Sequence, residues 1–452
     1  MADSAQKGAV TFVDALNRIE MRPFQWLIVA TCMLVLVSDG IDLQLLGIVA
    51  PLVMEDFGVD RSTFGIAMGS ALVGFGLGSA GGGIIGDRLG RRYALAIAAL
   101  VFSLATIGAG TSTDVWSMAI WRLLGGLGFG AAYANALTMA SEWTSDKWRP
   151  ITVSTLSVGT PIGGTIVGWV GPDLAASSGW GGTFTFFGIL TLLLIPIILL
   201  LLKDSPAFLL GKGKEEQARK HAALVLEDDI ALKADDNSDA DGTPGANSIF
   251  DNEIMRLNIG VGFAFAAAAL VAYSILSWST TFLTAAGFTL DEAGNAVSIG
   301  GITSMIGSIA VGAAMRQFGS KPVLIIIGAV LMAILVALGW SVEGLPEVPT
   351  SSDKTLVTAL IGASGAFFSA GIAGIYVIMA AGYPSRFRST GIGLGILMSR
   401  IGAVGASAFG GWLLDLGGDS VIPFFATLVV SAGLILAAAF VIDRHVPSLS
   451  KS

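Results

Sequence analysis

The amino-acid sequence predicts an all-α membrane protein with twelve transmembrane helices in two halves of six. Of its 452 residues, 54% are hydrophobic and 13% are charged, which is about half the charged share of an ordinary soluble domain. The apolar residues gather in runs long enough to cross a bilayer, which takes about 20 helical residues. One long polar break separates the first six runs from the last six.

The runs define the predicted domains. We expect a cytoplasmic tail at 1–23, a six-helix half at 24–202, a central loop at 203–253, a second six-helix half at 254–442 and a cytoplasmic tail at 443–452. The central loop holds 12 acidic and 6 basic residues, a composition typical of a disordered linker rather than a folded output domain. The twelve runs are 24–52, 62–84, 93–112, 115–141, 150–171, 182–202, 254–285, 293–315, 321–341, 355–382, 388–415 and 420–442.

The distribution of basic residues predicts the orientation of the chain. With the N-terminus inside, 21 of the 25 Lys and Arg lie in cytoplasmic segments. Only Arg61 and Lys354 face outward, while Arg122 and Arg400 lie within spans. Because basic loops stay inside, both termini and the central loop are expected in the cytoplasm. The first run has no small-residue cleavage site before it, so we interpret it as a retained span and not as a signal peptide.

Several classes of function are disfavoured by the composition. No basic patch is interleaved with aromatic residues, so nucleic-acid binding is not expected. The single cysteine, Cys32, excludes an intrachain disulfide. Both histidines, His221 and His445, lie outside the predicted spans. We therefore expect no catalytic residues, no intramembrane metal site, no cofactor and no enzymatic activity.

Two acidic residues stand inside the first apolar run. Asp39 and Asp42 belong to the sequence VSDGIDLQ at 37–44. An acid near the centre of a span costs roughly 2.5–3.5 kcal/mol on insertion scales, so two of them indicate a function. Three residues apart, they share a helix face, where both cannot ionise cheaply. This pattern predicts a proton carrier, and it leaves open which of the two carries the proton.

Two arginines within spans are candidate counter-charges. At 1.5 Å per residue, Arg122 lies about 10 Å below the outer start of its helix, and Asp39 about 22 Å from a cytoplasmic start near Phe24. These compatible depths predict a buried Arg122–Asp39 pair, which either controls the proton or only holds two helices together. Arg400 lies about 18 Å from a start near Arg388, close to the midplane. Its planar guanidinium suits a carboxylate, so it is either an anion anchor or a partner of Asp39 or Asp42.

A short basic turn follows the second run. Residues 83–92 read GIIGDRLGRR, and a degenerate copy, GAAMRQFGSK, follows the eighth run at 312–321. The arginines alone would only anchor the turn at the lipid headgroups. The complete pattern resembles the loop signature of the major facilitator superfamily. In the second copy Arg316 and Gln317 replace the acid and the arginine, so only the first copy is expected to keep its charge network.

Further motifs resemble the aromatic acid:proton symporter family within that superfamily. They are the first-helix segment 39–44 followed by Pro51, the fourth-helix segment 131–136 leading to Glu142, the SPAFL sequence at 205–209, and YPSRFRSTGIG at 383–393. The preceding segment, 122–130, resembles the fourth-helix motif of the superfamily as a whole. The resemblance covers all twelve spans. It implies the major facilitator fold and a proton-coupled symporter that imports an aromatic carboxylate across a bacterial inner membrane by alternating access. It also implies a monomer whose partners are the organic anion, the proton and the lipid bilayer.

The resemblance and the charges together give the expected site. Proton coupling is assigned to Asp39, Asp42 and Arg122, and substrate binding to Arg400, Gln44, Asn135, Phe367 and Phe368, although aromatic residues in a span more often belong to the core or face lipid. The expected cytoplasmic gate is Gly83, Asp87, Arg88, Gly90, Arg91, Glu142 and Arg388.

One segment points to another transport class. Residues 159–164 read GTPIGG and are reminiscent of the fifth-helix motif of antiporters in the superfamily. A proline kink explains the segment equally well. An exchanger or an exporter of aromatic compounds or other small organic anions therefore remains the alternative.

Overall fold

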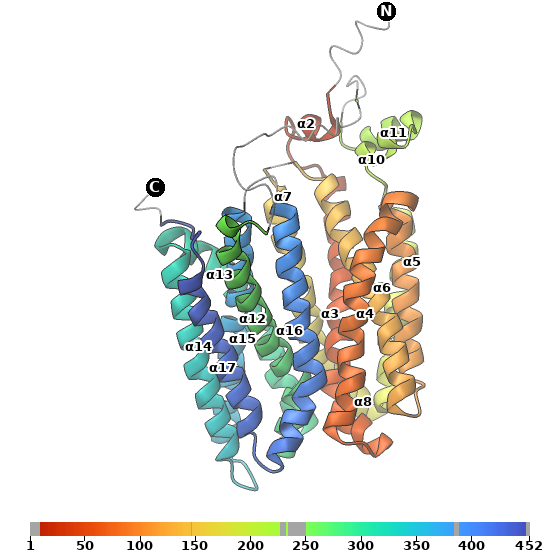
Figure 1. The fold of residues 1–452 in the computed structure, drawn as a ribbon. Coiled ribbons are helices and arrows are strands. Elements are labelled where there is room, and N and C mark those ends of the chain that lie inside the picture. Colours follow the sequence, from red (N-terminus) through yellow and green to blue (C-terminus); the bar gives the residue numbers. More distant parts are fainter. Residues whose placement is uncertain (1–9, 146, 227–231, 234–249, 384–387, 449–452) are drawn as a thin grey trace, which may run out of the picture.

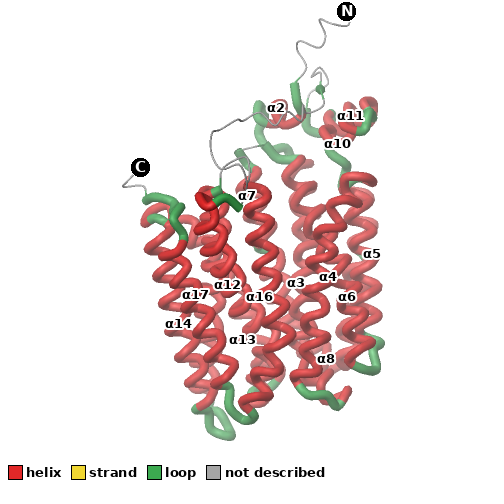
Figure 2. Tube along the Cα trace, in the orientation of Figure 1, coloured by secondary structure: helices red, strands yellow, loops and turns green. Residues whose placement is uncertain are grey.

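The computed structural model describes residues 10–145, 147–226, 232–233, 250–383 and 388–448 (Figure 1). Long helices stand side by side in one bundle, and loops are confined to its two ends (Figure 2). This arrangement confirms the predicted all-helical class. Eleven helical segments of the described chain are long and apolar enough to cross a membrane.

The first half of the bundle precedes the central loop. Three of its helices, α2, α4 and α6, begin at a side chain that caps the first backbone N–H groups. The Asp114 carboxylate, for example, accepts hydrogen bonds from the N–H groups of Trp116 and Ser117 at 2.8 and 3.0 Å, and these bonds hold the pKa of Asp114 below its usual value. The helices are α2 (Phe12–Leu16), α3 (Pro23–Phe57), α4 (Arg61–Leu89), α5 (Arg91–Ala109), α6 (Val115–Glu142), α7 (Arg149–Ser157), α8 (Gly159–Leu192) and α9 (Leu194–Leu201).

The second half follows two short helices of the central loop, α10 (Pro206–Gly211) and α11 (Glu215–Ala222). Its six long helices are α12 (Asn252–Ala285), α13 (Leu290–Phe318), α14 (Ser320–Glu343), α15 (Ser351–Gly382), α16 (Arg388–Gly417) and α17 (Ile422–Val441). The short helices α2, α10 and α11 all lie at one end of the bundle (Figure 1). We call this the terminal end, and the opposite end, with the turn between α3 and α4, the far end.

One apolar segment is twice as long as a single crossing requires. Gly159–Leu201, formed by α8 and α9, has 43 residues, whereas about 20 suffice. Its backbone leaves helical geometry at Gly179, where φ is 71° and ψ is 170°. Before this glycine the chain runs along α3 toward the far end, and after it the chain returns along α5. A positive φ is readily adopted only by glycine, so Gly179 permits this reversal.

Glycine recurs every four residues along α4, at Gly74, Gly78, Gly82 and Gly86, and close helix packing explains this spacing. A Cβ atom on Gly74 or Gly78 would overlap the backbone of α6 at Leu123 or Leu127. Small residues at this spacing let two helix backbones approach closely. The spacing therefore joins α4 to α6 within the first half.

The two halves contact each other toward the far end. A Cβ on Gly65 of α4 would overlap the carbonyl of Ala408 in α16. Thr280 of α12 donates a hydrogen bond to the carbonyl of Gly47 in α3, and Ser298 of α13 donates to a carbonyl of α8 at 3.0 Å. These three contacts close the interface between the halves on the far side of the site described next.

Candidate functional site

Asp42 and Arg122 form a buried ion pair inside the first half. Arg122 Nη1 lies 2.5 Å from Asp42 Oδ2, and the hydroxyl of Thr106 donates to Asp42 Oδ1 at 2.8 Å. Both charged side chains are almost inaccessible to solvent. Since each carboxylate oxygen has a partner, the charge of Asp42 is compensated within the half that contains it.

This pairing corrects the expectation from helix depth, which joined Arg122 to Asp39. Three residues correspond to about 4.5 Å along a helix, which is less than the uncertainty in where each helix starts. Depth therefore found the correct pair of helices but not the correct turn.

Asp39 lies in a different environment. It is buried, and its only hydrogen bond among the described residues comes from the Thr160 hydroxyl to Oδ2, at 3.3 Å. No described cation forms an ion pair with it. The cation that acts most strongly on its carboxylate is Arg400, ahead of Arg122. Gly40 brings Thr160 close, since a Cβ there would overlap the Thr160 backbone.

Arg400 stands on α16, so its charge belongs to the second half. Its guanidinium carbon lies 4.0 Å from the ring centroid of Phe75 on α4, a cation–π contact between the halves. Its Nη1 donates to the hydroxyl of Tyr273 on α12 at 3.2 Å. The phenols of Tyr133 and Tyr376 are further electrostatic neighbours. Arg400 is partly accessible and forms no ion pair with a described acid, so its charge is available to an anion.

The aromatic residues around Arg400 were missed by the sequence reasoning. Tyr133 lies within a motif that was recognised, but no role was assigned to it, and Phe75, Tyr273 and Tyr376 were not considered. One signal was available: the chain has only five tyrosines, and three of them lie in the interior of apolar runs, whereas Tyr93 only begins a run and Tyr383 follows one. A tyrosine there needs a partner for its hydroxyl, which is a reason to look for a polar site.

The other predicted substrate-binding residues lie in helix contacts. Asn135 donates both amide hydrogens to backbone carbonyls, of Gly82 and Ala131, each at 2.8 Å. Gln44 packs against Gly164 of α8. Phe368 is buried in the main apolar cluster and Phe367 packs against it. Their roles in substrate binding stay predictions, and Asn135 also holds α6 against α4.

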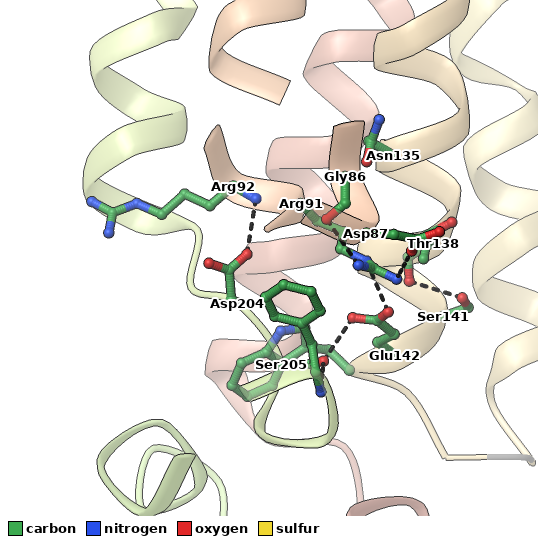
Figure 3. Close-up of polar contacts among 12 residues, drawn as sticks. Gly86, Asp87, Arg91, Arg92, Asn135, Thr138, Ser141, Glu142, Asp204 and Ser205 are labelled. Atoms are coloured by element: carbon green, nitrogen blue, oxygen red, sulfur yellow. Dashed lines mark hydrogen bonds and ion pairs between the residues drawn. The ribbon is translucent and has the colours of Figure 1, made fainter. Parts of the chain in front are cut away.

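Three of the predicted gate residues, Asp87, Arg91 and Glu142, form an ion network at the terminal end (Figure 3). Arg91 is its centre, with Nη2 2.7 Å from Asp87 Oδ1 and Nε 3.0 Å from Glu142 Oε1. Arg91 Nη1 also donates to the carbonyl of Gly86 at 2.9 Å. The hydroxyl of Ser205 donates to Glu142 Oε2 at 2.6 Å. The network thus joins the turn between α4 and α5 to the end of α6 and the start of α10.

A second contact holds the same turn. Gly90 adopts φ 99°, and a Cβ there would press on the Asp204 carboxylate. That carboxylate accepts a hydrogen bond from the Arg92 backbone N–H at 3.0 Å. Gly83 is partly buried in the last turns of α4 and Arg88 is exposed. The side chain of Arg388 lies outside the described part of the structure.

The Major Facilitator Superfamily profile matches residues 32–344 of the chain. The chain belongs to the Major Facilitator Superfamily. It is therefore a transport protein and not an enzyme.

Relatives extend over nearly the whole chain. The 4-hydroxybenzoate transporter PcaK of Pseudomonas aeruginosa is 28% identical, over 94% of this chain and 93% of its own length. The gallate transporter of Pseudomonas putida is 27% identical, over 96% and 95%. A partially occluded, inward-open structure of the xylose transporter XylE from Escherichia coli aligns with a TM-score of 0.69 at 20% identity, over 93% and 97%. The predicted likeness to aromatic acid transporters is thus confirmed.

The second half of this superfamily member repeats the turn without its acidic residue. Gly319, between α13 and α14, adopts φ 85° and ψ 156°, close to the 99° and 149° of Gly90. Here the chain that follows α17 takes the place of Asp204. Ser320 N–H donates to the carbonyl of Val446 at 3.0 Å, and Val446 N–H donates to Ser320 Oγ at 2.9 Å. His445 Nδ1 lies 3.0 Å from Ser320 Oγ. We call these contacts the C-terminal clasp.

Proposed function

We propose that the protein is a proton-coupled symporter that imports an aromatic monocarboxylate across a bacterial inner membrane. The family supplies the transport class, and the names of the relatives favour the aromatic acid. The observation that carries the proposal is the placement of Asp39 and Arg400. They are opposite charges on different halves, Arg400 is the cation that acts most strongly on the Asp39 carboxylate, and the two side chains do not form a direct ion pair.

The proposal assumes twelve crossings, with the terminal end in the cytoplasm. The reversal at Gly179 supports counting the segment Gly159–Leu201 as two spans that meet at this glycine. The bias of Lys and Arg toward the terminal end supports the orientation. The far end then faces outward, and the contacts between the halves there describe a carrier closed to the outside.

Arg400 is proposed as the anchor of the substrate carboxylate. A guanidinium presents parallel N–H groups that match both oxygens of a carboxylate. Phe75 covers one face of the guanidinium, which leaves its edge for the anion. An aromatic substrate would then place its ring among Phe75, Tyr133 and Tyr376, in offset or edge-to-face contacts.

Asp39 is proposed as the coupling proton site. A buried carboxylate without an ion pair is costly, and uptake of a proton removes that cost. While Asp39 is charged, its negative charge offsets part of the positive charge of Arg400, so Arg400 attracts a substrate anion less strongly. When a proton neutralises Asp39, Arg400 attracts the anion more strongly, and by linkage a bound anion favours the proton to the same extent. Proton and substrate therefore bind together.

The gate network is proposed to act in the conformational step. Alternating access in such carriers is a rocking of the two halves around a site near the midplane. Arg91, Asp87 and Glu142 join three segments of the first half at the cytoplasmic end, so they keep that end rigid while the halves move.

Uptake by proteoliposomes tests the proposal. An acidic outside medium should drive accumulation of labelled 4-hydroxybenzoate or a related acid, and a protonophore should abolish it. Accumulation that survives collapse of the pH gradient would refute proton coupling.

Exchange is the second candidate. It is favoured by the GTPIGG segment, because Thr160 in that segment donates to Asp39. An exchanger would show counterflow between internal and external acid but no net uptake driven by a pH gradient. A symporter shows both.

A further inference from the structure

Tyrosine is concentrated around Arg400. The chain has five tyrosines, and Tyr133, Tyr273 and Tyr376 are all electrostatic neighbours of this arginine. They come from α6, α12 and α15, so both halves contribute. The other two lie elsewhere: Tyr93 is exposed at the start of α5, and Tyr383 donates to Asn258. A scarce residue type gathered at one point indicates a chemical requirement there.

The three hydroxyls differ in their partners. Tyr273 accepts the hydrogen bond from Arg400 and so fixes the orientation of the guanidinium. The hydroxyls of Tyr133 and Tyr376 have no protein partner in the described part of the chain. A phenol hydroxyl both donates and accepts, and leaving one unpaired in a poorly hydrated place is costly. These two hydroxyls are therefore suited to a polar group on a ligand.

The rings of these tyrosines are held in place. Tyr133 packs on Phe75, with centroids 5.6 Å apart. Tyr376 packs edge-on against the buried Phe265 at 5.0 Å, yet it remains 39% exposed. Tyr376 is also an electrostatic neighbour of Arg400. The two free hydroxyls thus belong to rigid rings next to the carboxylate anchor.

The geometry points to Tyr133 and Tyr376 as specificity-determining residues that select a ring-hydroxylated aromatic acid over its unsubstituted analogue. This inference rests on the proposed function, with Arg400 holding the carboxylate. The aromatic ring separates the carboxylate from the ring hydroxyl, which then meets the phenols. Tyr273 is a positioning residue, because it acts on the substrate through Arg400.

A site that hydrogen-bonds a substrate hydroxyl discriminates against an analogue without it, because the site's own polar groups then lose their partner. One hydrogen bond of ordinary strength corresponds to about a tenfold preference. An apolar ring pocket would show no comparable preference, since added hydroxyls are poorly distinguished by apolar surfaces.

The test compares 3-hydroxybenzoate and 4-hydroxybenzoate with benzoate in proteoliposomes containing the full chain. The readout is the ratio of kcat/KM for the better hydroxylated acid to that for benzoate. We expect a ratio of about ten in the parent. Tyr133→Phe and Tyr376→Phe, which each remove one oxygen, should bring the ratio toward one, whereas Tyr93→Phe should leave it at the parent value. Because both acids are measured on one preparation, loss of folded protein cancels in the ratio.

The outcomes separate the two claims. If the parent transports none of the three acids, the proposed function fails and this inference with it. If the parent transports them without preferring a hydroxylated acid, or if both Tyr→Phe variants keep the parent ratio, the inference alone is overturned. Tyr273→Phe provides a further check, because it should alter KM for all three acids by a similar factor.

Discussion

The two buried acid–arginine associations differ in whether their side chains are in contact. We call Asp42–Arg122 the closed pair and Asp39–Arg400 the open pair. Arg122 Nη1 lies 2.5 Å from Asp42 Oδ2 within one half, and the Thr106 hydroxyl donates a hydrogen bond to the other carboxylate oxygen. Asp39 and Arg400 belong to different halves and influence each other without contact. A closed pair inside a rigid half can stabilise it but cannot readily release a charge. An open pair across the interface between the halves can exchange its partners, which is what the proposed coupling requires.

The largest expected effect comes from opening the closed pair. Arg122→Ala leaves the Asp42 carboxylate buried without its cation, which should cost about 3–5 kcal/mol in the free energy of unfolding. Thermal unfolding of purified protein in detergent measures this. The Arg122→Ala/Asp42→Asn double variant should recover much of the stability. If Arg122→Ala alone is as stable as the parent, the ion pair does not stabilise the first half.

The open pair should behave in the opposite way, with a large effect on transport and a small one on stability. Arg400→Lys keeps a positive charge but loses the bidentate edge, so kcat/KM for uptake should fall about tenfold to a hundredfold. Arg400→Ala should also abolish the thermal stabilisation caused by an aromatic acid. Arg316→Ala, which removes an exposed arginine at the terminal end, is the charge-matched control. Unchanged ligand stabilisation in Arg400→Ala would remove this residue as the anchor.

The gate network tests whether an ion pair within one half can also affect turnover. Arg91→Gln breaks the contacts to Asp87 and Glu142 and should lower the uptake rate about tenfold, the effect of one or two charge-assisted hydrogen bonds. The exposed neighbour offers a matched control, since Arg88→Gln should change the rate much less. Equal losses in the two variants would show that only the local positive charge matters.

The smallest effect is expected at the C-terminal clasp in the second half. Burial lowers the pKa of His445, so the unfolded state binds the proton more readily than the folded state. The contribution of neutral His445 is then complete above the ordinary histidine pKa of about 6.5 and is lost as the pH falls through the lower folded value. The difference in unfolding temperature between the parent and His445→Gln should therefore shrink from pH 7.5 to pH 5.5. A difference that grows on acidification would reverse the sign of this linkage.

Composition and motif were sufficient for the all-helical class and the family. Apolar run length predicted the helices, and the GIIGDRLGRR turn was placed correctly because its contacts to α6 depend on a local pattern. Helix depth found α3 and α6 as partners. It could not distinguish Asp39 from Asp42, because one helical turn is smaller than the error in a helix start.

The rotation of helices about their axes was not accessible from the sequence. The site around Arg400 depends on which faces of α4, α6, α12 and α15 turn toward α16, and apolar spans carry little amphipathic signal for this. The C-terminal clasp is formed by backbone groups of Val446 and by Ser320, and backbone contacts leave no residue-type signature. These features required the three-dimensional structure.

Asp39→Asn tests the central claim, that the open pair couples the proton to the substrate. Proton-driven accumulation and counterflow of the same aromatic acid are measured in parallel for Asp39→Asn and Asp42→Asn. We predict that Asp39→Asn loses accumulation but keeps counterflow, because Arg400 still binds the anion while no proton is carried. Proton-driven accumulation that persists in Asp39→Asn would contradict the account, as would this pattern appearing in Asp42→Asn instead.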